Sequence, residues 1–131
     1  MPHTRIHSGA PWEPVVGYCR AVVAGPIIAV SGTTAVNEQG ELVGEGDAYA
    51  QARQCLAIIV RALGEAGASV DDVIRTRMYV TNIEDWEAIG RAHQEVFGAA
   101  PPATAMVEVA RLMDERMLVE IEADAVIAAS G

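Results

Sequence analysis

Aromatic residues are scarce in this chain of 131 residues, which has one Phe, two Trp and three Tyr. Its hydrophobic content of 51% therefore comes mostly from Ala, Val, Ile and Leu, which predicts one tightly packed aliphatic core. No run of about 18 apolar residues occurs, and the amino terminus lacks the basic and apolar regions of a secretory signal. We expect a cytoplasmic protein with no membrane partner, in which residues 1–131 form a single domain.

Cysteine and basic residues are also few. Cys19 and Cys55 lie far apart with no metal-ligand spacing around them, so we expect two buried free thiols and no metal site. Nine basic residues face 18 acidic ones, and the formal net charge of −9 opposes binding to a polyanion. We therefore expect no nucleic-acid partner.

Motifs for phosphate binding and for nucleophilic catalysis are missing. The glycine-rich residues 40–46 contain neither GxGxxG nor GxxxxGK, so no cofactor is expected. Ser31-Gly32-Thr33-Thr34 is not framed as the GxSxG turn of a catalytic serine. Its hydroxyls and backbone amides instead suggest a place to hold a polar ligand.

Two long helices are predicted from apolar residues at helical spacing. The first covers residues 48–66, with Asp47 placed to cap its amino end. Asn82 caps the second, in which Trp86 is expected to pack as an anchor and Gly98 marks the end.

Five strands are predicted, of which two lie in residues 18–30 and meet as a hairpin at Gly25-Pro26. A glycine-rich loop follows, with a small hairpin closed at Asn37 to Gly40. The other three strands cover residues 73–81, 104–112 and 117–127. Together these elements predict an α+β domain with a mostly antiparallel mixed sheet and both helices packed on one face.

The predicted strands have one apolar and one charged face. Ile74, Thr76, Met78 and Val80 alternate on the inner face of their strand, opposite Arg75, Arg77, Tyr79 and Thr81. In the last strand Glu120, Glu122 and Asp124 share the outer face. That face also carries Val107, Val109, Leu118 and Val126. Subunit association would cover it, and the alternative is a solvated face with weak surface ion pairs.

Five stretches along residues 14–127 resemble the RidA/YjgF family, preceded by the amino-terminal segment 1–13. They read VSGTTAVNEQGELVGEGD, YAQARQCLAII, EAGASVDDVIRTRMYVTNIEDW, VFG with PPATAMVEVARL, and VEIEADAV. The resemblance implies a chorismate-mutase-like α+β fold and a homotrimer with small-molecule ligands bound in clefts at the subunit interfaces. It also implies hydrolysis of small imines and enamines, such as 2-aminoacrylate, to a keto acid and ammonia.

The sequence departs from the family pattern at the cleft. The family's carboxylate-binding arginine, in a PAR motif, corresponds to Thr104, and the cysteine two residues later corresponds to Met106. A family tyrosine of the second helix corresponds to His93. Loss of the arginine removes a bidentate carboxylate clamp, and its exchange for threonine would cost several kcal/mol of binding if nothing compensated.

Other cleft positions are retained, and each allows more than one interpretation. Tyr18, Ser31, Gly32 and Glu120 match family cleft positions, and Thr33 adjoins them. Glu120 can position a water or take a proton, or it can form an ion pair inside the trimer. His93 is a proton shuttle or a histidine at the edge of the core.

Arg77 is the candidate to replace the missing arginine, and its alternative role is to pair across strands with Glu120 or Glu122. Three functions remain open. The first is imine or enamine deamination, and the second is non-catalytic binding of a small molecule by a trimer. The third, an endoribonuclease activity, is disfavoured by the acidic charge.

Overall fold

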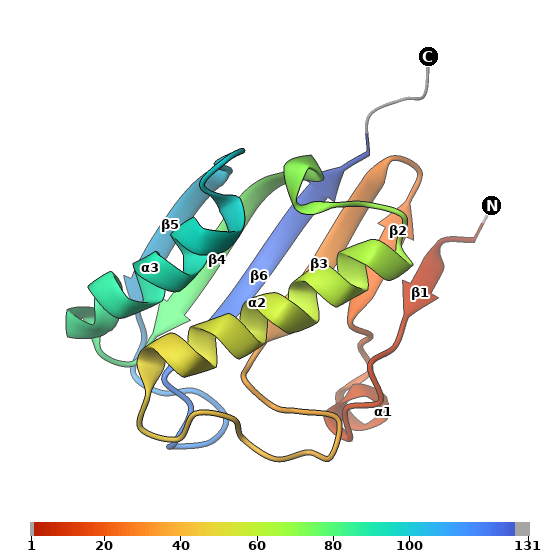
Figure 1. Cartoon of the computed structure of the whole chain (residues 1–131). Coiled ribbons are helices and arrows are strands. Elements are labelled where there is room, and N and C mark those ends of the chain that lie inside the picture. Colours follow the sequence, from red (N-terminus) through yellow and green to blue (C-terminus); the bar gives the residue numbers. More distant parts are fainter. Residues whose placement is uncertain (1, 128–131) are drawn as a thin grey trace.

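The computed structural model describes residues 2–127, so residue 1 and residues 128–131 of the predicted domain lie outside the described part. One six-stranded sheet runs through it in the order β1-β2-β3-β6-β4-β5 (Figure 1). The strands are β1 (Thr4–Ile6), β2 (Ala21–Ala24), β3 (Ile27–Thr33), β4 (Val73–Val80), β5 (Ala103–Glu108) and β6 (Val119–Val126). The α-helices are α1 (Trp12–Val16), α2 (Ala48–Glu65) and α3 (Trp86–Phe97), with 3₁₀ turns at Val70–Asp72 and Ile83–Asp85.

The two long helices, α2 and α3, cross the same face of the sheet, as predicted (Figure 1). Helix α2 begins as expected, because the Asp47 side chain accepts a hydrogen bond of 3.0 Å from the Ala50 amide. Its apolar stripe, which includes Cys55, Leu56 and Ile59, is fully buried against the sheet. Within residues 2–127 no helix combines the length and the apolar character needed to cross a membrane.

The sheet is mixed but mostly antiparallel, which confirms the predicted fold class. Only β4 and β5 run parallel; the remaining neighbours pair antiparallel. The predicted hairpin of β2 and β3 turns at Gly25, whose φ of 62° suits glycine. In β6 the burial alternates as predicted, with Glu120, Glu122 and Asp124 on the face away from the core.

The predictions for Ile74 and Trp86 were wrong. Ile74 is 55% exposed, because the pairing of β4 with β6 shifts register between Val73 and Arg75, and Val73 takes the buried position instead. Trp86 is also 55% exposed in the single chain and is not a core anchor. The second helix starts later than expected, since Asn82 caps the short 3₁₀ turn that leads into α3.

The amino-terminal segment forms two elements that the periodicity did not indicate. Strand β1 adds an edge to the sheet beside β2, and the short helix α1 follows it. Alternation over three residues, or one helical turn, is too short to predict. This segment nevertheless forms one wall of a cavity of about 580 Å³.

Candidate functional site

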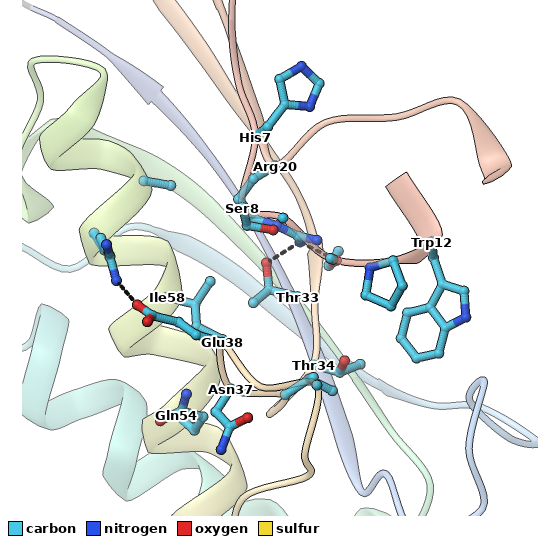
Figure 2. A pocket seen from close by; sticks show the side chains of 18 of the residues that line it. His7, Ser8, Trp12, Arg20, Thr33, Thr34, Asn37, Glu38, Gln54 and Ile58 are labelled. Atoms are coloured by element: carbon cyan, nitrogen blue, oxygen red, sulfur yellow. Dashed lines mark hydrogen bonds and ion pairs between the residues drawn. The ribbon is translucent and has the colours of Figure 1, made fainter. Parts of the chain in front are cut away.

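A cavity of about 580 Å³ lies between the amino-terminal segment, the end of β3, the loop after it and α2 (Figure 2). This volume is in the range of small-molecule sites. Gln54 and Ile58 of α2 line it on one side, and His7, Ser8 and Trp12 line it on another (Figure 2). Four residues expected from the sequence also line it: Tyr18, Gly32, Thr33 and Glu120.

Glu120 is half-buried in this cavity and lies against Gly32. A Cβ added at position 32 would stand 2.5 Å from Glu120 Oε2, so only glycine allows the observed approach. Burial raises the pKa of the Glu120 carboxyl, the negative charge of Glu122 adds to the rise, and Arg20 opposes it. Glu120 is therefore a carboxyl group that can exchange a proton nearer to neutral pH than an exposed glutamate.

A bulge in the sheet shapes this part of the cavity. The register between β3 and β6 shifts between Val30 and Thr33, at Ser31-Gly32. Ser31 Oγ donates a hydrogen bond of 2.6 Å to the Cys19 carbonyl, and Ser31 lines a neighbouring open hollow rather than the cavity that contains Glu120. Ser31 thus supports the wall, and bulges of this kind often re-aim side chains beside functional sites.

Arg20 is a charged cavity residue that the sequence did not reveal. It lines the cavity, yet only 6% of it is exposed. Its Nη1 donates to the Gly32 carbonyl at 2.8 Å and to Thr33 Oγ1 at 2.9 Å (Figure 2). Nothing in strand alternation distinguishes a buried arginine from a surface one, so no signal in the sequence indicated this residue.

Glu13 of α1 is the buried carboxylate nearest to Arg20. Although burial alone would raise its pKa, hydrogen bonds from the Ser8 hydroxyl and amide, together with His7 and the charge of Arg20, hold the pKa of Glu13 below its usual value. The distance from Glu13 Oε2 to Arg20 Nη2 is 3.9 Å, too long for a hydrogen bond. Besides the pairing of β1 with β2, the contacts of Ser8 and His7 with Glu13 thus hold the amino-terminal segment in place.

The remaining predicted residues form a separate cluster between α3 and strands β4 and β5. Thr76 Oγ1 lies 2.8 Å from His93 Nε2 and 2.8 Å from Thr104 Oγ1. Thr104 Oγ1 also lies 3.3 Å from the Pro102 carbonyl. If Nε2 carries the proton, His93 donates a hydrogen bond to the Thr76 hydroxyl, which donates to the Thr104 hydroxyl, which donates to the Pro102 carbonyl. Each hydroxyl then accepts one hydrogen bond and donates one.

His93 and Met106 are accordingly parts of the packing around this cluster. Burial lowers the pKa of His93, so the imidazole is neutral at pH 7. Its ring also lies 4.7 Å from the Phe97 ring, and Met106 is partly buried against the core. Both observations agree with a histidine at the edge of the core.

The predicted site residues therefore divide into two groups within one chain. Thr104 lies on β5 and Glu120 on β6, two strands apart and roughly 10 Å or more from each other. Their side chains also lie on different faces of the sheet. Thr104 pairs with the buried Thr76 and Glu120 pairs with Tyr79, and residues 76 and 79 of β4 point to different faces. A single chain does not bring them into one site.

Arg77 is engaged on the outer sheet face and does not enter the cavity. Its Nη1 lies 3.2 Å from Asp124 Oδ2 and 3.6 Å from Glu122 Oε1. The Tyr79 hydroxyl donates a hydrogen bond of 3.0 Å to the same Glu122 oxygen. The expected cross-strand pairing is confirmed for Glu122. Leu118, expected on this face, instead packs partly against the core, while Val107 is 47% exposed.

Comparison with known proteins agrees with this fold. The model of the family described as Endoribonuclease L-PSP matches residues 8–127. An uncharacterised protein of Streptomyces coelicolor is 41% identical over 122 residues, covering 92% of this chain and 90% of that protein. A Mycobacterium tuberculosis protein of the YjgF/YER057c/UK114 family superposes with a TM-score of 0.87 at 45% identity, over 96% of this chain and 100% of that one. Escherichia coli TdcF, solved with bound serine, gives a TM-score of 0.78 at 31% identity, over 85% and 88% of the two chains.

This is a small α+β protein with the YjgF fold. It has a six-stranded sheet with two helices on one face and a cavity that contains Glu120. The chain belongs to the RidA/YjgF family, to which the Endoribonuclease L-PSP model also corresponds. Both the family and the fold class predicted from the sequence are confirmed.

Proposed function

We propose that this protein hydrolyses a small imine or enamine in the cavity around Glu120. The observation that carries the proposal is the half-buried carboxyl of Glu120, which has a raised pKa and is held against Gly32 in a cavity of about 580 Å³. An imine carbon is already electrophilic, so the reaction requires little more than a bound substrate, a positioned water and one group that moves a proton.

In the proposed reaction, Glu120 accepts a proton from water as the water oxygen forms a bond to the imine carbon. The C=N electron pair moves to nitrogen, which takes up a proton from solvent, and a carbinolamine results. Glu120 then returns its proton to the nitrogen as the C–N bond breaks and ammonia leaves, while the carbinolamine hydroxyl loses its proton to solvent and becomes the carbonyl of the product. An enamine enters the same route after protonation at carbon converts it to the imine.

We further propose that three copies of the chain assemble and that the functional clefts lie at their interfaces. The separation of Thr104 from Glu120 in one chain supports this, because a neighbouring copy would have to supply Thr104, His93 or Met106 to a cleft that contains Glu120. The outer sheet face supports it too, since exposed Val107 and Val126 flank the Arg77 ion pairs there. The serine bound to Escherichia coli TdcF is a ligand of the size that this cavity could hold.

The second candidate is a trimer that binds a metabolite without converting it. Thr104 favours this alternative, because it carries no charge and its hydroxyl is already engaged with Thr76 and Pro102. Tyr18, Gly32 and Thr33 would then hold the ligand, with Glu120 as a hydrogen-bonding partner only. An endoribonuclease activity, the name of the matching family model, has least support, since the net charge of −9 repels RNA.

Ammonia release from freshly generated 2-aminoacrylate and from a panel of small imines tests the proposal. We expect the native protein to be active and Glu120→Gln to lose about a hundredfold or more of the rate. Thr104→Arg is the second variant, since it restores the family's arginine. An inactive native protein that becomes active as Thr104→Arg would reject catalysis and favour the binding module.

A further inference from the structure

Arg20 is the one buried cation in the part of the chain that the structure describes. The chain has nine Lys and Arg residues, all of them arginine, and Arg20 alone among them is buried. A buried guanidinium is strongly destabilising unless its charge and its N–H groups find partners. The hydrogen-bond partners that the Arg20 guanidinium has, and those that it lacks, therefore indicate the role of this residue.

One end of the Arg20 guanidinium is fixed. Both N–H groups of Nη1 are used, one on the Gly32 carbonyl at 2.8 Å and the other on Thr33 Oγ1 at 2.9 Å. The Arg20 backbone is fixed as well, because its amide donates to the Ile6 carbonyl and its carbonyl accepts from the Ser31 amide. This arrangement sets the plane of the guanidinium beside the bulge.

The other edge has no hydrogen-bond partner. Nε is buried and makes no hydrogen bond to any residue from 2 to 127. Within the same residues Nη2 makes none either, and its nearest carboxylate oxygen, Glu13 Oε2, is 3.9 Å away. Nε–H and Nη2–H form the edge that binds a carboxylate through two parallel hydrogen bonds.

Glu13 does not take this edge, because its oxygens are occupied elsewhere. Ser8 donates to Glu13 through its amide and hydroxyl, and His7 Nδ1 lies 3.1 Å from Glu13 Oε1. An unpartnered buried donor is rare in native proteins and requires an explanation. A carboxylate bound in the cavity that Arg20 lines would supply one (Figure 2).

We propose that the Nε–Nη2 edge of Arg20 binds the carboxylate of the ligand, in place of the arginine that Thr104 replaces. This inference rests on the proposed function and assigns the binding of a ligand's carboxylate to Arg20. Arg20 and Glu120 both line the cavity and Gly32 contacts both, so a carboxylate at Arg20 directs the rest of a short molecule toward Glu120. Arg20 thus acts as a binding and orienting residue, while Glu120 moves the proton.

Binding of pyruvate and of its neutral amide, pyruvamide, tests the carboxylate site without any chemistry. Calorimetric titration of the native protein should show pyruvate binding at least tenfold more tightly than pyruvamide. Arg20→Lys keeps the positive charge but loses the two-pronged edge, so pyruvate affinity should fall about ten- to a hundredfold, with pyruvamide little changed. Arg53→Lys is the matched control on the exposed side of α2, outside the cavity, and should bind like the native protein.

A second measurement uses the native protein alone, in case Arg20→Lys does not fold. The Arg20 Nε–H signal in a ¹⁵N-edited NMR spectrum should shift on addition of pyruvate and should shift far less with pyruvamide, because only the carboxylate offers two charged acceptor oxygens to the Nε–Nη2 edge. A signal unmoved by saturating pyruvate would overturn the proposal. So would equal binding of pyruvate and pyruvamide, or an Arg20→Lys protein that folds and binds pyruvate as tightly as the native one.

These outcomes are separate from those of the proposed function. If the protein hydrolyses imines but the Arg20 signal does not respond to pyruvate, the carboxylate site is rejected and the proposed hydrolysis stands. Pyruvate binding through Arg20 without ammonia release from any imine would reject the hydrolase and leave a carboxylate-binding protein.

Discussion

The carboxylate of Glu120 is so close to Gly32 that the two positions form one unit, with Oε2 only 2.5 Å from where a Cβ of residue 32 would be. Gly32→Ala must therefore push the carboxylate aside. Because the displaced atoms are the far end of a flexible side chain, the free energy of unfolding should change by only about 1 kcal/mol. We expect the rate of imine hydrolysis to fall roughly a hundredfold, as when a proton-transfer group is misplaced.

Gly64→Ala is the matched control for this substitution. Gly64 lies inside α2, and a Cβ there meets nothing within 4 Å. Alanine should stabilise the helix by roughly 0.5 to 1 kcal/mol and leave the rate unchanged. Parallel thermal unfolding and ammonia-release assays check both variants. A fully active Gly32→Ala protein would show that the position of the Glu120 carboxylate does not matter for catalysis.

The pH dependence of the rate should report the Glu120 carboxyl. Burial raises its pKa above the ordinary glutamate value of 4.5, and the charge of Glu122 adds to this effect. Because Glu120 must be ionised to accept a proton from water, the rate should fall as the pH drops through this raised value. Glu122→Gln removes the nearby negative charge and should move the acidic limb of the profile to lower pH. An acidic limb unmoved by Glu122→Gln would assign the limb to another group.

The same carboxyl should lower the stability of the protein at neutral pH. A carboxyl with a raised pKa in the folded state binds protons more tightly there than in the unfolded chain, so stability falls as pH rises from 4.5 through the folded value. Glu120→Gln should therefore be more stable than the native protein at pH 7. The difference in stability should shrink below pH 4.5, where the Glu120 carboxyl becomes neutral like the glutamine of the variant. Urea titrations at several pH values measure it, and a variant less stable at pH 7 would contradict the expectation.

The sheet and the long helices could be predicted because their patterns extend over many residues. Helix α2 repeats its apolar stripe over 18 residues, and β6 alternates over eight. The exposed side chain of Ile74 could not be predicted, because a bulge depends on how two distant strands pair and leaves no trace in the alternation of one strand. Trp86 shows a similar limit, since helical spacing locates a stripe but not how far the neighbouring elements cover its end.

Only part of the site could be predicted, and for a related reason. Glu120 and Gly32 were found through the family pattern, which preserves positions along the chain. Arg20 has no such signal, because its burial results from the bulge at Gly32 and from the amino-terminal segment packing over it. The separation of Thr104 from Glu120 likewise depends on the order of strands in the sheet, which the sequence pattern leaves open.

The two hydroxyls of the hydrogen-bonded cluster between His93 and Pro102, those of Thr76 and Thr104, should contribute unequally to the free energy of unfolding. Thr76 is fully buried and contacts both His93 and Thr104, whereas Thr104 is exposed. Thr76→Val should lower the free energy of unfolding by about 1 to 3 kcal/mol, because it leaves a partly buried histidine nitrogen without its hydrogen-bond partner. Thr104→Val should cost less than about 1 kcal/mol, since water can replace its hydroxyl. Urea denaturation of both variants measures the two effects, and a larger loss for Thr104→Val would contradict this hydrogen-bond arrangement.

The proposed trimer predicts both a mass and a sensitive residue. Light scattering should give three times the chain mass of 13.8 kDa. Arg77 lies 3.2 Å from Asp124 and 3.6 Å from Glu122, so Arg77→Glu would place a new negative charge beside these two carboxylates on the outer sheet face. If that face is buried between subunits, the unpaired charges should weaken assembly and shift the mass toward that of one chain. Arg53→Glu changes the net charge equally on the exposed side of α2 and should leave the mass unchanged. A native protein with the mass of a single chain would reject the trimer, and a trimeric Arg77→Glu protein would show that this face lies outside the interface.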